Sequence, residues 1–158
     1  IDANTKDRAN YILATSYMET GDEAKGESYF KKLSTSTNIK YASEAQYTLA
    51  LLQYSKGDLT SSEKTIRQMT KNDVDDYYLA KAFILWSDIF VQKGNDFQAK
   101  QTLKSIIDNF EGDENLLKEA QDKLDKLENK QKIEKEQNEE KLQNQENTVD
   151  EVIIEDNK

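Results

Sequence analysis

The stretch AFILWSDIFVQKGNDFQAKQTL, residues 82–103, determines the fold of this chain more clearly than any other part of the sequence. Its large apolar residues recur at intervals of three and four up to the pair Gly94-Asn95, and a second run with helical spacing follows that pair. Apolar residues at such intervals form one stripe along an α-helix. The stretch therefore predicts two helices joined by a tight turn at Gly94.

Two earlier segments repeat this arrangement. The pairs Gly21-Asp22, Gly57-Asp58 and Gly94-Asn95 follow one another at intervals of 36 and 37 residues. When the three glycines are aligned, small, large and aromatic residues recur in one order. The aligned residues before the glycines are Ala9, Leu13, Ala14 and Tyr17, then Ala45, Leu49, Ala50 and Tyr54, then Ala82, Trp86, Ser87 and Phe90. Those after the glycines are Gly26, Phe30 and Leu33, then Ser62, Ile66 and Met69, then Ala99, Leu103 and Ile106.

Each class of aligned residue has a role in packing. A small residue in each helix, such as Ala50 and Ser62, lets two helix backbones approach closely. A glycine permits the left-handed conformation that ends a helix, and the Asp or Asn after it can cap the next one. The repeat thus predicts an all-α fold of helix–turn–helix units, each about 34 residues long.

The expected boundaries follow from this pattern. The six helices are predicted near residues 5–20, 23–34, 40–56, 60–71, 76–93 and 97–110. They form units at 5–38, 40–74 and 76–111, and a capping helix at 113–127 presents the apolar stripe Leu117, Ala120, Leu124 and Leu127. Residues 1–127 are therefore expected to form one domain, and 128–158 a charged helical extension. From Val149 we expect an unstructured tail, with a peptide that docks as an added strand as the alternative.

Segments such as 9–30 and 45–66 resemble the tetratricopeptide repeat family, and residues 82–103 resemble the C-terminal repeats of large bacterial (Bacteroidetes-like) multi-repeat proteins. The resemblance implies an α-solenoid and a location in the periplasm or cell envelope. The proline that often ends a unit in this family is absent, and the linkers 34–40 and 72–76 are longer than the minimal repeat needs, which leaves the superhelical pitch open. The chain opens at Ile1 instead of Met, which suggests a fragment or a processed form. If further repeats precede it, residues 5–20 would expose an apolar face here.

The composition excludes most kinds of catalytic site. The 158 residues contain no cysteine and no histidine, so the common nucleophile–base pairs and metal ligands are missing. The five glycines are too dispersed for a phosphate-binding loop. The acid clusters Asp73, Asp75, Asp76 and Glu111, Asp113, Glu114 lack the spacing of a calcium loop, so capping of the following helices explains them better. We therefore expect no enzyme, no cofactor and no metal site.

The charge and hydropathy of the chain limit the kinds of partner that it is expected to bind. The net charge is −9, so a nucleic acid backbone is an unlikely ligand. No apolar stretch approaches the length of a membrane span, so direct membrane insertion is not expected. The remaining expectation is a protein or peptide partner, with self-association as a further possibility.

Stacked hairpins of this family present their first helices on a concave face. Helical spacing from the apolar stripe predicts which side chains line that groove. This predicted groove set is Arg8, Tyr11, Thr15, Met18, Glu44, Tyr47, Leu51, Tyr54, Lys81, Ile84, Asp88 and Val91. Tyrosine and methionine are common in protein interfaces, although Tyr11, Tyr47 and Tyr54 could equally pack between hairpins. The function expected is a protein-binding scaffold, and the alternative is a structural or self-assembly segment of a larger envelope protein.

Overall fold

The computed structural model describes residues 2–155, and its side chains are described up to residue 143. Over residues 2–155 the chain is all helical, with no β-strand. It divides into two compact units, residues 1–121 and 122–158. The helices are α1 (Ala3–Glu19), α2 (Glu23–Leu33), α3 (Ile39–Ser55), α4 (Leu59–Met69), α5 (Asp76–Gln92), α6 (Asp96–Asn109) and α7 (Glu114–Glu155). All seven begin within about three residues of the positions expected from the sequence.

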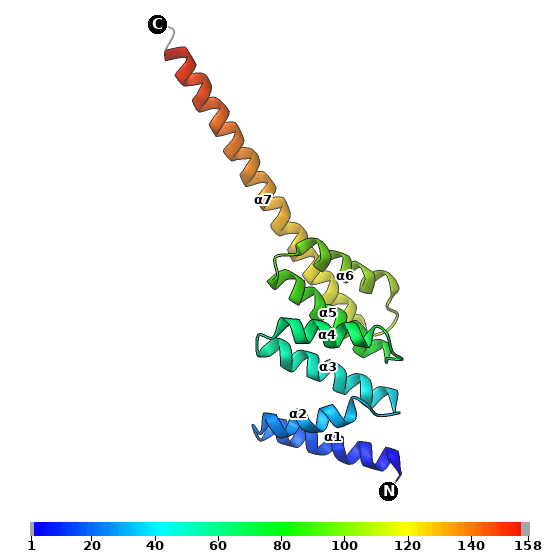
Figure 1. The fold of residues 1–158 in the computed structure, drawn as a ribbon. Helices are drawn as coiled ribbons and strands as arrows, with labels where there is room; N and C mark the ends of the chain where they lie inside the picture. The colour runs from blue at the N-terminus through cyan, green and yellow to red at the C-terminus, as the bar shows by residue number, and fades with distance from the viewer. Residues whose placement is uncertain (1, 156–158) are drawn as a thin grey trace. The chain divides into compact units, whose positions relative to one another are not determined.

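The first six helices pair as three consecutive hairpins. The most extensive contacts join α1 to α2, α3 to α4 and α5 to α6. Further contacts join α2 to α3, α3 to α5 and α4 to α5, so each hairpin packs on the next (Figure 1). The helix–turn–helix units predicted from the repeat are therefore present in the first unit of the chain.

The three turns adopt the left-handed backbone conformation, which favours the glycine found at each of them. Gly21, Gly57 and Gly94 have φ angles of 82°, 79° and 72°, and they are the only positive-φ residues in the described part of the chain. At Gly57 the turn N–H groups of Gly57 and Asp58 donate to the carbonyls of Tyr54 and Gln53, both at 2.9 Å. These two bonds are the Schellman motif that ends a helix at a left-handed residue. The side chains of Asp22, Asp58 and Asn95 then cap α2, α4 and α6.

The predicted pairs of small residues lie where the two helices of each hairpin meet. Ala14, Ala50 and Ser87 in the first helices are buried, as are Gly26, Ser62 and Ala99 in the second helices. The Ser62 hydroxyl donates a 2.7 Å hydrogen bond to the Ala50 carbonyl oxygen across the second hairpin. A Cβ atom added at Gly26 would lie 3.2 Å from the carbonyl oxygen of Ala14. Small side chains thus set the distance between the paired helices.

The apolar core lies between hairpins as well as within them. One buried cluster joins the first hairpin to α3 and consists of Ala14, Phe30, Leu33, Ala45 and Leu49. Another joins the second hairpin to α5 and consists of Ala50, Ile66, Met69, Ala82, Leu85 and Ile89. Burial of apolar surface is the main favourable term in folding, so the first helix of the following hairpin stabilises the first and second hairpins.

An ion pair recurs at both junctions between hairpins. Lys56, at the end of α3, lies 2.8 Å from Glu27 of α2, and Lys93, at the end of α5, pairs in the same way with Glu63 of α4. Hydrogen bonds from Lys31 and then Lys56 lower the pKa of Glu27 below the usual value for glutamate, and those from Lys93 and then Arg67 lower that of Glu63. Because the partners are partly exposed to water, these pairs add little stability; they mark the repeated geometry.

The first helix leaves an apolar face uncovered. Leu49 of α3 is 8% exposed, because it packs against Phe30 and Leu33 of the preceding helix. Its aligned counterpart Leu13 is 38% exposed, and the neighbouring Ile12 is 52% exposed. Ala9 is exposed too. We call Ala9, Ile12 and Leu13 the α1 apolar face.

The register and length of α7 differ from the sequence-based expectation. Leu116 and Ala120 are buried, whereas Leu117, which was predicted in the stripe, is only half-buried. The helix continues to Glu155, through the segment from Val149 that was expected to be unstructured, while residues 156–158 lie outside the described part. No glycine follows Gly112 and the chain has no proline, so no residue interrupts the helix. Ion pairs at 3.9 Å (Lys130–Glu134) and 3.7 Å (Lys135–Glu139) support this solvent-exposed part.

Candidate functional site

The predicted groove set lies on α1, α3 and α5, the first helices of the three hairpins. Most of its side chains are half-buried or exposed, so part of their surface is accessible to a ligand. Ile84 is the exception, because it is only 4% exposed and belongs to the packed interior. The helix that carries it, α5, packs against α3, α4 and α6. Ile84 is therefore removed from the groove set.

A carboxylate of the second hairpin, Glu44, lies beside one tyrosine from the first hairpin and one from the third. The Tyr11 hydroxyl of α1 donates to Glu44 Oε1 of α3 at 2.8 Å. Tyr78 of α5 lies on the same side as this carboxylate, since both line one hollow with Tyr11. The hydrogen bond to Glu44 raises the pKa of Tyr11, and burial followed by the effect of Glu44 raises the pKa of Tyr78. Both phenols are thus protonated at neutral pH, where they act as hydrogen-bond donors and not as bases.

These residues surround a hollow of about 500 Å³, which we call the tyrosine pocket. The Tyr11 and Tyr41 ring centroids are 5.6 Å apart, and the rings are tilted by 45°. Tyr41 also packs against the buried cluster of the first hairpin, so its position is fixed from one side. The lining residues are Asn4, Tyr11, Asn38, Lys40, Tyr41, Glu44 and Tyr78. The hollow combines rigid aromatic walls with a few polar groups, as ligand sites in proteins commonly do.

Tyr41 and Tyr78 were not among the residues predicted from the sequence. Each lies 16 residues before a repeat glycine, Gly57 or Gly94, so the two occupy one position of the repeat. The repeat alignment began four residues later, at Ala45 and Ala82. Extending it towards the start of the helices would have identified both tyrosines.

Tyr47 and Tyr54 combine the two roles that the sequence left open. Both pack against the buried cluster between the second and third hairpins, and burial raises the pKa of Tyr47. The Lys81 ammonium lies 4.6 Å from the centroid of the Tyr47 ring, in cation–π geometry. The Tyr54 hydroxyl accepts a 2.6 Å hydrogen bond from Gln92 of α5. These tyrosines therefore link α3 to α5 and keep part of their surface open.

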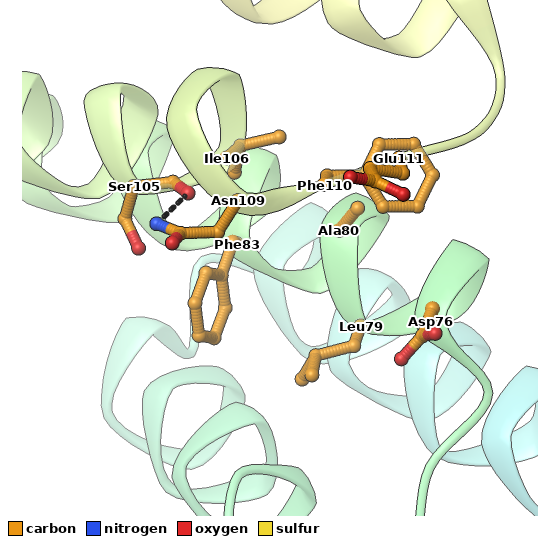
Figure 2. Close-up of a pocket in the computed structure, with 9 residues that line it drawn as sticks. All are labelled: Asp76, Leu79, Ala80, Phe83, Ser105, Ile106, Asn109, Phe110 and Glu111. Carbon is orange, nitrogen blue, oxygen red and sulfur yellow. Dashed lines mark hydrogen bonds between the residues drawn. The ribbon is translucent and has the colours of Figure 1, made fainter.

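A second hollow lies between the start of α5 and the end of α6 (Figure 2). Its volume is about 390 Å³, and none of its lining residues belongs to the predicted groove set. The lining residues are Asp76, Leu79, Ala80, Phe83, Ser105, Ile106, Asn109, Phe110 and Glu111. We call it the α5–α6 pocket.

The acid clusters act as caps, as the sequence suggested. The Asp75 carboxylate accepts from the N–H groups of Tyr77 and Tyr78 at the start of α5. Asp113 accepts from the N–H of Leu116 at the start of α7, at 3.0 Å. In the part of the chain whose side chains are described, no group of three or more acidic residues is arranged to hold a metal ion.

Comparisons with protein family models, with curated proteins and with solved structures find no match for this chain. Within residues 2–155, no helix combines the length and the apolar character needed to cross a lipid bilayer.

Proposed function

We propose that this chain is a non-catalytic scaffold that binds a protein partner through the face formed by its first helices. The observation that carries the proposal is the tyrosine pocket, where Glu44 of the second hairpin, Tyr11 of the first and Tyr78 of the third line one open hollow. Tyrosine offers a large contact area at a low cost in conformational entropy, which is why it is frequent in protein interfaces.

The proposal includes an α-solenoid of the tetratricopeptide type. Three features support it: left-handed glycines at one position of each unit, buried small residues at the helix crossings, and ion pairs that recur at both junctions. Such arrays commonly use the surface of consecutive repeats to hold an extended peptide or a helix. The partner then runs along α1, α3 and α5 and inserts a side chain into the tyrosine pocket.

Replacing Tyr11 and Tyr78 together with alanine is expected to reduce partner capture by about tenfold or more, because tyrosines at the centre of an interface carry much of the binding energy. The measurement is mass spectrometry of proteins captured by the purified chain from lysate of its source organism. A chain ending at Leu127 should retain the same partner.

The matched control for this experiment is Tyr17→Ala. Tyr17 lies on the same helix as Tyr11 and is also half-buried, but it stacks on Tyr29 at 5.7 Å, away from the tyrosine pocket. Circular dichroism establishes that all variants remain folded. If the folded double variant captures the same proteins as the native chain, or if Tyr17→Ala loses them equally, the proposal is wrong.

A second candidate function, self-assembly, is favoured by the α1 apolar face. Most of its counterparts in α3 and α5 are buried against a neighbouring helix, namely Ala45, Leu49, Ala82 and Leu85, so the same face of α1 can receive a helix. In this case the occupant is a second copy of the chain, pairing its own α1 face. Light scattering over a concentration series should show a dimer that Leu13→Lys converts into a monomer, because a buried lysine would lose its hydration. A native chain that stays monomeric throughout contradicts this candidate.

A further inference from the structure

The repeat provides an internal comparison for the α5–α6 pocket. A hollow of the same volume, about 390 Å³, lies at the same place of the first hairpin. Asp76, Leu79 and Phe83 of α5 precede Gly94 by the same intervals at which Ala3, Lys6 and Asn10 precede Gly21. Ser105 and Phe110 likewise match Lys32 and Thr37. Hairpin geometry therefore produces the hollow, but it does not dictate what lines it.

The side chains that line these two hollows differ at the matched positions. In the first hairpin the lining is polar and includes Lys6 and Lys32, and the Ser36 hydroxyl donates a hydrogen bond to Asp7 across it. In the third hairpin Leu79, Phe83 and Phe110 take the places of lysine, asparagine and threonine. The hollow itself therefore does not require an apolar lining, although Leu79 and Phe83 also pack against the second hairpin.

The apolar floor of the α5–α6 pocket is held in place by the core. Ala80 and Ile106 are buried, and Leu79 and Phe83 pack against the buried cluster between the second and third hairpins. The Phe110 ring fills the space beside Gly112, where an added Cβ atom would lie 2.9 Å from the ring. Leu79, Phe83 and Phe110 remain only half-buried, so their apolar surface is available to a ligand.

The rim of this pocket is acidic. Asp76 lies at the start of α5 and Glu111 just beyond α6, and Figure 2 shows both at the same end of the pocket as the Phe110 ring. Both are exposed, and no lysine or arginine is among the lining residues. Two carboxylates beside an apolar hollow favour a ligand that carries positive charge next to an apolar group.

We propose that the α5–α6 pocket binds a large apolar side chain, of aromatic type, from a peptide segment of another protein, with a neighbouring basic residue held by Asp76 and Glu111. The aromatic side chain contacts Phe83 and Phe110, and aromatic pairs prefer the offset or edge-to-face geometry that two separate rings allow. This site is distinct from the tyrosine pocket and does not depend on the function proposed for it.

The test uses the full chain and three blocked tripeptides, Lys-Phe-Lys, Glu-Phe-Glu and Lys-Ala-Lys. NMR titration follows the backbone amide signals of Ser105, Phe110 and Glu111. We expect Lys-Phe-Lys to bind about tenfold more tightly than either of the others, because each of those loses either the charge or the apolar contact. Equal binding of Lys-Phe-Lys and Glu-Phe-Glu, or no shift of these signals with any peptide, would overturn the proposal.

Charge variants test the contribution of the acidic rim to binding separately from that of the apolar floor. The double variant Asp76→Asn, Glu111→Gln is expected to bind Lys-Phe-Lys and Glu-Phe-Glu with affinities within about twofold of each other, because it removes both rim charges and leaves the apolar floor intact. The matched control, Asp108→Asn with Glu114→Gln, removes two nearby acids that do not line the pocket. If the control abolishes the preference to the same degree, general attraction to an acidic chain explains the result and the proposed site is wrong.

Discussion

Replacing Ile66 with alanine is expected to lower the free energy of unfolding by about 2–5 kcal/mol, the range measured for truncating a large aliphatic side chain in a packed core. Ile66 has no exposed surface, and it lies in the cluster that joins the second hairpin to α5. The loss combines the transfer energy of the removed methyl and methylene groups with the cavity left behind. Urea denaturation followed by circular dichroism gives the change in free energy.

The chain offers a control of the same residue type. Ile12 lies on the α1 apolar face and is 52% exposed, so Ile12→Ala should change the free energy of unfolding by no more than about 0.5 kcal/mol. Both residues are in helices, so the difference between the two variants reports tertiary packing and not helix propensity. Similar losses at the two positions would mean that the cluster around Ile66 is not a packed core.

Enlarging the small residue Ala82 should also destabilise the chain. Ala82 has no exposed surface, and it packs in the same cluster as Ile66. Ala82→Leu is expected to reduce the free energy of unfolding by about 1–3 kcal/mol, because additional methylene groups in a full core displace the backbone or force strained rotamers. The thermal midpoint and the urea midpoint should both fall.

Ala9 is the matched control for this substitution, since it occupies the same position of the repeat in α1. It is exposed, so Ala9→Leu should change the free energy of unfolding by no more than about 0.5 kcal/mol. A large loss at Ala9 would show that another part of the chain covers the α1 apolar face in solution. Equal tolerance at both positions would contradict the packing of the third hairpin on the second.

Much of the fold could be predicted from the spacing of a few residues. The turn glycines and the capping residues form hydrogen bonds within about six residues of each other, so the turns can be recognised in the sequence. The small residues at the crossings were predictable for a related reason, since each hairpin is local in the chain. Helical periodicity likewise indicated most of the buried positions, such as Phe30, Leu33 and Leu103.

The candidate site was predicted less completely. Tyr11 and Glu44 were placed on one surface, and the structure joins them by a hydrogen bond. The role of Tyr78 depends on how closely α5 approaches α3, which the repeat alignment alone did not give. The α5–α6 pocket was not anticipated at all, because Asp76 and Glu111 are separated in the sequence by the whole third hairpin.

The sequence by itself determined the local structure of this protein: the positions of the hairpins, their left-handed turns and their caps, each of which depends on backbone sterics within a few residues. Only the tertiary structure decided which member of an aligned set is buried. Ala9 and Ala82 share a repeat position yet differ in exposure, and Leu116 lies in the buried stripe where Leu117 also fitted the periodicity. The physical reason is that burial depends on a neighbouring helix, and the spacing of residues within one helix carries no information about where that neighbour lies.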